Sequence, residues 1–284
     1  MLTELAALTR REFLKLARNP QAILTSLMLP LLYLLLFGQG FNINPAQFLP
    51  PGSPPAEVHQ VVLTYFRGAP DYYSYFAAGM VGFVSVTATL FIGANVIFDR
   101  LFGVLKRTAA TPATATSIFG SRLLAGMIQP IGLAFLVLGL AILLGHLGLA
   151  GLSVTASVSF LGAAEVVLAI VLLSAMFASL FIAIGFSLEQ PQTYFAVVNA
   201  INLPVLLTSA ALFPWGTMPV WFQNIASYNP ITLAVNVLRE NLFAGSSAYY
   251  PYDPAVYLLG LFVWGVAMFI VAVLLARRAL APRK

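Results

Sequence analysis

The sequence predicts an all-α, polytopic membrane protein with six transmembrane helices. Of its 284 residues, 60% are hydrophobic and only 8% are charged, whereas a soluble domain carries about 25% charged residues. The mean hydropathy is +0.92. Apolar stretches recur along the chain, and each is long enough to cross a hydrocarbon core about 30 Å thick. We therefore expect one transmembrane domain that covers residues 1–284.

Charge distribution supports an even number of spans. The six apolar stretches cover residues 21–41, 73–98, 118–145, 157–186, 194–213 and 255–276. With the N-terminus in the cytoplasm, twelve of the 14 Lys and Arg residues lie on the cytoplasmic side, as the positive-inside rule requires. The net charge of +5 then reflects topology and contact with anionic lipid, not nucleic-acid binding. We expect a prokaryotic cell membrane with both termini in the cytoplasm.

Residues 1–19 are expected to form an amphipathic helix on the cytoplasmic membrane surface. Their apolar side chains recur at helical spacing, and Arg10, Arg11, Lys15 and Arg18 gather on the opposite face. Asn19 and Pro20 end this helix before the first span. The helix either anchors the topology alone or also contacts a partner, and the sequence leaves both open.

Residues 42–72, between the first two spans, are interpreted as a small extracellular cap. The segment contains six prolines, a density that is expected to prevent a continuous helix. Within it, residues 61–66 fit either a short strand or a helical turn.

The densest charge cluster follows the second span. Asp99, Arg100, Lys106 and Arg107 lie within nine residues, and four charges would be costly in lipid, so the loop is expected to stand in water. A short basic loop held between two spans is well placed to receive force from a soluble partner. The alternative is a solvated turn that only sets the topology.

Several kinds of active site have no motif in the sequence. None of the three lysines follows a glycine, so no phosphate-binding loop is present and any ATP hydrolysis needs a separate chain. The chain has no cysteine, and its two histidines, His59 and His146, lie in different loops. We therefore expect no catalytic, cofactor or metal site in this chain.

An ion-coupled carrier is the mechanistic alternative, because such carriers keep ionisable groups inside the membrane. The acidic residue that fits this role is Glu165, which lies near the start of the fourth span. It is expected to couple ions or bind substrate, or else to face a water-filled vestibule or pair with a neighbouring helix.

Residues 214–243 are too apolar for a free loop and too interrupted by proline for a span. Aromatic side chains such as Trp215 and Trp221 favour the membrane–water interface. We expect two short re-entrant helices that meet at Asn229 and Pro230. Asn229 would cap the second helix, with Pro230 at its first position, and Arg239 would lie near the outer interface.

These features together resemble the membrane subunit of an ABC-2 type transporter, of the daunorubicin-resistance and nodulation-export kind. The charged loop is similar to the family's motif through Arg100, Gly103, Thr111 and Pro112. The expected re-entrant hairpin at residues 214–243 is similar to a second motif of the family through Pro219, Trp221, Asn229, Pro230 and Arg239. The loop departs from the family pattern at Leu101, Val104 and Lys106, so the partner's groove is expected to differ in charge.

The resemblance implies a type V exporter fold and a division of labour. Two permeases, either copies of this chain or homologues, would each sit on an ATP-binding subunit that holds ATP and Mg²⁺. Residues 99–116 would form the coupling helix that docks on this ATPase, through Asp99, Arg100, Gly103, Lys106, Arg107 and Pro112.

The resemblance also implies a substrate pathway along spans one, two and five. Its expected lining is mostly apolar with a few polar groups: Tyr33, Phe37, Tyr194, Phe195, Asn199, Asn202 and Ser209. Asn199 and Asn202 are three residues apart and are expected on one helical face. Such a lining suits a hydrophobic or amphipathic molecule such as a drug, a lipid or a lipid-linked glycan. Alternatively, these polar residues join helices to one another, and an ion-gradient-driven carrier or channel would need no ATPase.

Overall fold

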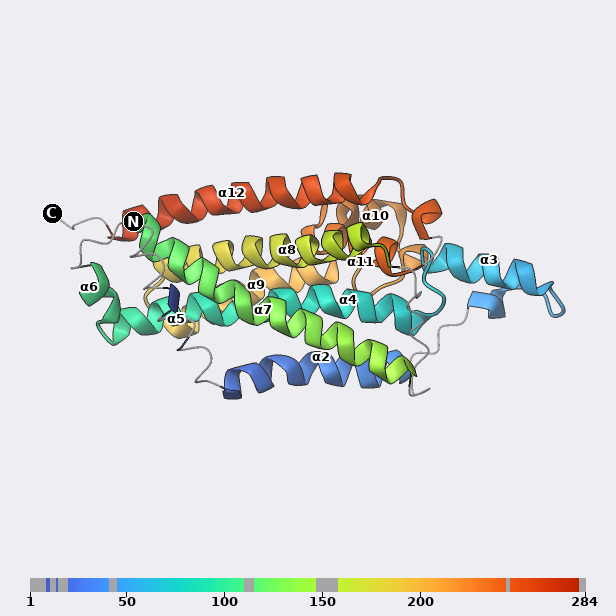
Figure 1. The fold of residues 1–284 in the computed structure, drawn as a ribbon, viewed down its shortest axis with the longest axis horizontal. Coiled ribbons are helices and arrows are strands. Elements are labelled where there is room, and N and C mark those ends of the chain that lie inside the picture. The colour runs from blue at the N-terminus through green and yellow to red at the C-terminus, as the bar shows by residue number, and fades with distance from the viewer. Residues whose placement is uncertain are drawn as a thin grey trace.

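A computed structural model describes residues 9–10, 14, 20–40, 45–109, 115–146, 158–243 and 246–280. Within these ranges the regular elements are all helical, and the long helices run side by side along the longest axis (Figure 1). Helix α6 lies at one end of this bundle and α3 at the other; we call them the α6 end and the α3 end. The elements are α2 (Pro20–Gly40), η1 (Pro45–Phe48), α3 (Pro55–Tyr65), α4 (Tyr72–Thr87), α5 (Leu90–Leu101), α6 (Val104–Ala109), α7 (Ala115–His146), α8 (Phe160–Ser187), α9 (Pro191–Leu207), η2 (Trp215–Thr217), α10 (Val220–Tyr228), α11 (Pro230–Leu242), η3 (Ser246–Tyr249) and α12 (Pro254–Leu280).

Four helical segments of the described chain are long and apolar enough to cross a membrane. They are Tyr72–Leu101, Ser117–Gly145, Phe160–Ser187 and Pro254–Arg278. They coincide with the second, third, fourth and sixth expected spans, so the multi-pass architecture is confirmed. The first expected span coincides with α2, and the fifth with the 17-residue α9, and the count of six stays a prediction.

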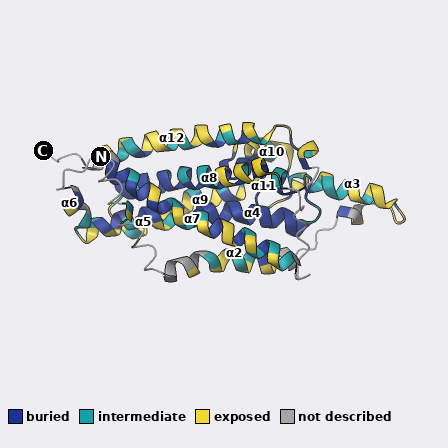
Figure 2. Cartoon of the chain, viewed as in Figure 1, coloured by how far each residue is buried: buried dark blue, intermediate teal, exposed yellow. Residues whose placement is uncertain are grey.

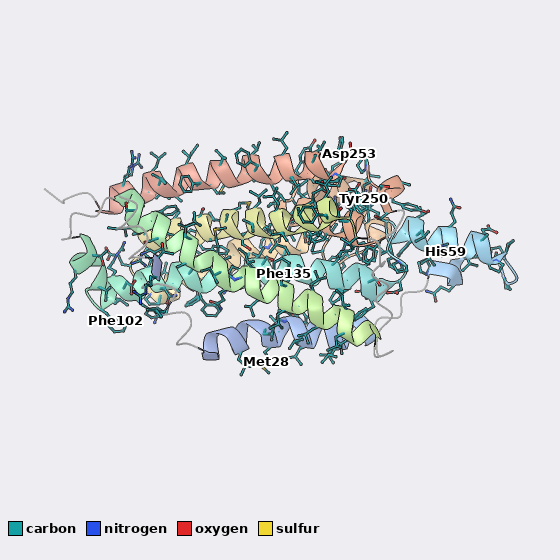
Figure 3. The ribbon with its side chains drawn as sticks, viewed as in Figure 1. Met28, His59, Phe102, Phe135, Tyr250 and Asp253 are labelled. Atoms are coloured by element: carbon teal, nitrogen blue, oxygen red, sulfur yellow. The ribbon has the colours of Figure 1, made fainter. Side chains whose placement is uncertain are left out.

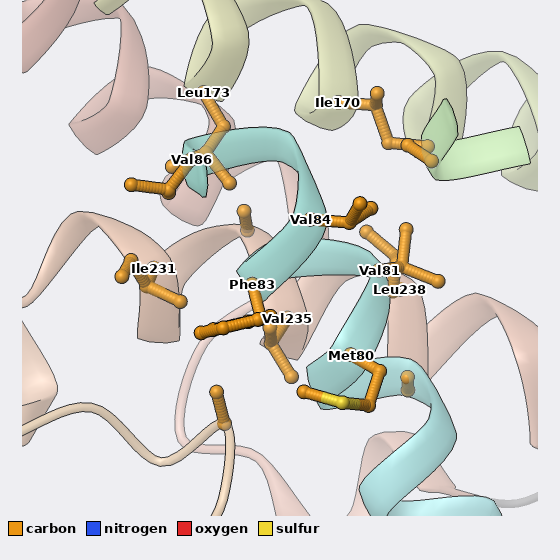
Figure 4. Packing of buried hydrophobic residues seen from close by; sticks show 14 of the residues in the cluster. Met80, Val81, Phe83, Val84, Val86, Ile170, Leu173, Ile231, Val235 and Leu238 are labelled. Atoms are coloured by element: carbon orange, nitrogen blue, oxygen red, sulfur yellow. The ribbon is translucent and has the colours of Figure 1, made fainter. Parts of the chain in front are cut away.

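The protein core lies around α4, α8 and α11. Helix α4 is buried from Tyr72 to Val86, because its sequence is apolar on all faces and neighbouring helices surround it. Figure 4 shows its side chains packed against Ile170 and Leu173 of α8 and against residues of α11. In contrast, α12 exposes much of its surface (Figure 2), as expected of a helix that faces lipid.

Two glycines bring the backbones of α5 and α8 into direct contact. A Cβ atom at Gly93 would collide with the carbonyl oxygen of Phe181, and one at Gly185 with the carbonyl oxygen of Gly93. Small residues at such a crossing let membrane helices approach closely. This contact fixes α5 on α8 and so determines where the end of α5 lies.

The segment between α2 and α4 differs from expectation. It contains the continuous 11-residue helix α3, which projects beyond the bundle in Figure 1. Residues 61–65 form its last turn, which agrees with the helical alternative and not with the strand, and the expectation that the prolines prevent a continuous helix was wrong. The prolines permit this helix because four precede it and Pro55 is its first residue, where no backbone N–H is needed for a helical hydrogen bond.

The fifth expected span is shorter than its apolar stretch. Helix α9 ends at Leu207, and residues 208–214 continue without helical structure. The expected amphipathic helix at residues 1–19 falls almost wholly outside the described residues, as do Thr111 and Pro112 of the charged loop.

Candidate functional site

The charged loop forms a tight turn followed by the short helix α6. Gly103, between α5 and α6, has a φ of +71°, a left-handed conformation that glycine adopts without steric cost. A Cβ there would meet no atom within 4 Å, so the backbone conformation and not the packing requires glycine. Figure 3 labels Phe102 beside this turn, at the α6 end.

Asp99 does not stand in water, contrary to the expectation for the whole charged loop. Its carboxylate Oδ2 lies 2.9 Å from Nη2 of Arg122 on α7, and the two side chains are only 6% and 5% exposed. The two opposite charges offset each other's desolvation, which is what permits them to be buried. The ion pair joins the end of α5 to α7.

Arg100 also binds within the chain. Its guanidinium donates hydrogen bonds to the carbonyl oxygens of Phe186, at 2.6 Å, and Leu188, at 2.8 Å. These carbonyls lie at the C-terminal end of α8, where helical partners are lacking and a positive charge is favourable. Arg100 therefore joins the loop to α8.

The side chains that remain available to a partner are partly apolar. Leu101 is 58% exposed and Phe102 is 74% exposed, and Arg107 is exposed as well. Leu101 and Phe102 were not among the contacts expected from the sequence, although two large apolar residues inside a charged loop are a signal of an interaction site. The side chain of Lys106 lies outside the described residues.

Helices α10 and α11 meet at Asn229, as the sequence predicts. The Asn229 side chain accepts a hydrogen bond from the backbone N–H of Ile231 at 2.9 Å, and Pro230 begins α11. The same side chain donates to the carbonyl oxygen of Val205 at 2.6 Å. Asn229 thus caps one helix and also holds the end of α9.

The two helices differ in burial. Helix α10 begins after Pro219, and its Trp221 is 64% exposed. Helix α11 is buried along almost all of its length. Near α10, the guanidinium of Arg67 stacks 3.5 Å from the centre of the Trp215 ring, which ties the segment after α3 to η2.

Arg239 is fully buried within the protein, and its expected position near the outer membrane interface stays a prediction. Its guanidinium donates to the carbonyl oxygens of Tyr75 at 2.8 Å and Ala210 at 2.9 Å. It also stacks 3.3 Å from the centre of the Tyr75 ring. The partners at Ala210 and Ala211 belong to the non-helical segment after α9, whose backbone needs hydrogen bonds that no helix supplies.

The expected pathway residues on α9 lie partly on its buried face and partly on its exposed face. Its buried residues recur every four positions, at Tyr194, Val198, Asn202 and Leu206, while Asn199 is exposed. Asn199 and Asn202 are neighbours on the helix surface but differ in burial, because a step of three residues moves Asn199 off the narrow buried stripe.

The other expected pathway residues make contacts within the chain. The Tyr194 hydroxyl donates to the carbonyl oxygen of Leu90 at 2.6 Å, and the Ser209 hydroxyl donates to that of Leu206 at 2.6 Å. The Tyr33 ring packs 5.8 Å from that of Phe83, and Phe195 packs 6.3 Å from Phe91. The side chain of Phe37 lies outside the described residues.

Glu165 pairs with a neighbouring helix. Its Oε2 accepts a hydrogen bond from Nδ2 of Asn241 on α11 at 3.0 Å. No group of three or more Asp, Glu or His side chains within the described ranges is arranged to hold a metal ion.

Comparison with known proteins identifies the family. The family model described as "ABC-2 type transporter" matches residues 3–243. The chain belongs to the ABC-2 type transporter family. The algal proteins named "Putative transport permease ycf38" are similar to this ABC-2 chain over 84% of its length. The protein of Porphyra purpurea is 29% identical over 74% of its own length, and that of Cyanophora paradoxa is 28% identical over 73%.

Family membership gives the α6 end its significance. In this ABC-2 chain the loop after the second span is tied to two long helices, by Asp99 to α7 and by Arg100 to α8. A displacement of the loop would therefore be carried into α7 and α8.

Proposed function

We propose that this chain is the membrane-spanning subunit of an ATP-driven exporter, and that a separate subunit binds ATP and Mg²⁺ and hydrolyses the ATP. The observation that carries the proposal is the fixed attachment of the charged loop to α7 and α8. A loop that transmits force needs anchors that do not yield. The buried ion pair of Asp99 with Arg122 and the two carbonyl contacts of Arg100 supply them.

The ATP-binding subunit would dock on the residues that the loop leaves exposed. Leu101 and Phe102 offer apolar area and Arg107 offers a charge. An apolar contact with a charged rim is a common composition for a protein interface. Closure of the ATPase would push this surface, and the anchors would turn the push into a movement of the spans.

The proposed topology places the α6 end in the cytoplasm and the α3 end outside, in the cell membrane of a prokaryote. Both termini would then be cytoplasmic, and α10 and α11 would form the re-entrant hairpin on the outer side. The exposure of Trp221 on α10 supports this placement, because tryptophan favours the membrane interface.

We further propose that two permeases assemble with their α2 and α9 faces toward the pathway. Both helices expose apolar residues, among them Leu32 and Leu36 of α2 and Leu203 and Leu207 of α9. Asn199 adds a polar group to the exposed face of α9. A surface of this composition suits a hydrophobic or amphipathic substrate such as a drug, a lipid or a lipid-linked glycan.

The proposal is tested with the permease and its ATPase reconstituted together in liposomes, measuring ATP hydrolysis and transport of a lipid or dye. The Arg100→Gln and Gly103→Val variants are expected to retain ATP hydrolysis and to lose most transport, because the loop loses an anchor or its turn. Glu57→Gln, an exposed residue on α3, is the matched control and is expected to behave as the unmodified chain. Unchanged transport in both loop variants contradicts the coupling role. Transport by the chain alone under a proton gradient would instead support the ion-driven carrier.

A further inference from the structure

Three acidic residues, one from each of three chain segments, lie at the α3 end. Helix α11, which carries Glu240, packs against both α8 and α12. Glu165 of α8 and Asp253, which precedes α12, lie close enough to Glu240 to act on its charge. Figure 3 labels Asp253 at this end of the molecule, far from Phe102 at the α6 end. None of these carboxylates belongs to the loop attachment described above.

The hydrogen bonds around this group leave Glu240 unsatisfied. The nearest amide in sequence, Asn241, directs its Nδ2 to Oε2 of Glu165 and to the carbonyl oxygen of Val237, both at 3.0 Å. Oε2 of Glu240 is buried and accepts no hydrogen bond from any described residue. A buried acceptor in this condition destabilises the folded chain, and more so when it is charged.

A second hydrogen-bond acceptor on the same face of α11 is also buried and without a donor in the described part of the chain. Asn236 precedes Glu240 by four residues, so the two side chains lie one turn apart. Asn236 is 3% exposed, and its Oδ1 has no partner among the described residues. An ionised carboxylate adds only acceptors to such a site, whereas a protonated carboxyl group carries a donor.

The electrostatic surroundings favour the neutral form of Glu240. Burial, the charge of Asp253 and the charge of Glu165 raise the pKa of Glu240 to about 7. The preceding residue, Arg239, directs its guanidinium to the carbonyl oxygens of Tyr75, Ala210 and Ala211.

The other elements packed against α11 contribute no further charged residue. Helices α4 and α10 and the short helix η3 have tyrosine as their only titratable residue type. The hydroxyl of Tyr250, after η3, is buried and has no partner within the described ranges.

We propose that Glu240 is a proton-binding site at the α3 end of the bundle, which is occupied in weakly acidic solution and empties in alkaline solution. Proton uptake gives the partly buried carboxyl group, whose Oε2 is fully buried, a donor and removes one of three neighbouring negative charges. The site is independent of the ATPase attachment and does not rest on the proposed transport activity.

Thermal unfolding of the purified full chain in detergent, measured between pH 5 and pH 9, tests the proposal. A carboxyl group whose pKa is raised in the folded state stabilises that state fully below its unfolded pKa and loses this contribution as pH rises through the folded pKa. The unfolding midpoint is therefore expected to fall as pH rises from the unfolded pKa of 4.5 to about 7, and to level off above it. Glu240→Gln is expected to remove this step, whereas the exposed control Glu57→Gln keeps it.

The neighbouring carboxylates give a second, independent measurement. Glu165→Gln and Asp253→Asn each remove a negative charge, so each is expected to lower the pH at which the step is centred. A step that persists in Glu240→Gln overturns the proposal. If Glu240→Gln does not fold, steps that stay at the unmodified pH in both neighbour variants overturn it equally. Because neither readout involves ATP or transport, failure here leaves the proposed function standing, and the reverse holds as well.

Discussion

Breaking the ion pair between Asp99 and Arg122 should destabilise the chain more than removing both charges. The pair is 2.9 Å long and its side chains are about 95% buried, so either single change removes the opposite charge that this pair supplies to the remaining buried one. Such a loss costs about 3–5 kcal/mol. Replacing both partners by neutral residues of similar volume removes the desolvation cost as well, and is often neutral or stabilising.

The assay is a double-mutant cycle of Asp99→Asn, Arg122→Met and the combined variant, followed by thermal unfolding. A loss of about 4 kcal/mol corresponds to roughly 10 °C in the unfolding midpoint, scaled from domains of somewhat smaller size. The double variant is expected to recover most of that difference. Arg107→Gln, which removes an exposed charge from the same loop, is the control and should shift the midpoint little. Strictly additive losses in the double variant would refute the reasoning, because they would mean that the two charges do not interact.

Three further changes test the α3 end. Arg239→Met should destabilise the chain by about 3–5 kcal/mol, since buried carbonyl oxygens lose their donors. An unfolding midpoint within about 2 °C of the unmodified protein would contradict the structure. Arg277→Met, on the exposed end of α12, serves as the control. Asn229→Ala should cost about 1–2 kcal/mol as a lost helix cap, and Asn229→Asp, which keeps the capping oxygen, should recover part of it in the same unfolding measurement. Gly79→Ala should lower the yield of folded protein, because its Cβ would collide with the backbone of Ala211; a normal yield would show that the two segments separate easily.

Local signals in the sequence were enough to predict the paired helices near the end of the chain. The Asn229-Pro230 pair predicts both the end of one helix and the start of the next, since a capping side chain and a proline at the first position act within a few residues. The structure has this corner, with α10 before it and α11 after it. Four of the expected spans were likewise predictable, because length and hydropathy are properties of the continuous chain.

The roles of the arginines were not predictable in the same way. Arg239 contacts Tyr75, which is 164 residues away in the sequence, and Arg100 contacts carbonyl oxygens 86 and 88 residues away. Charge and spacing alone indicated residues at a membrane interface or in a partner's groove. A backbone carbonyl acceptor leaves no mark in the sequence, because every residue carries one, so only the folded chain reveals which arginine binds which oxygen.

Helix α8 has a consequence for how the two ends of the molecule depend on each other. Its Phe186 carbonyl is held by Arg100 at one end, and its Glu165 carboxylate by Asn241 at the other. The 21 residue steps from Glu165 to Phe186 span about 32 Å at 1.5 Å per residue, and no proline interrupts this stretch. The helix is thus continuous and held by a contact at each end, so it shifts or tilts as one rigid body. A movement that begins at one of these two contacts is therefore transmitted along the helix to the other, without intermediate side chains.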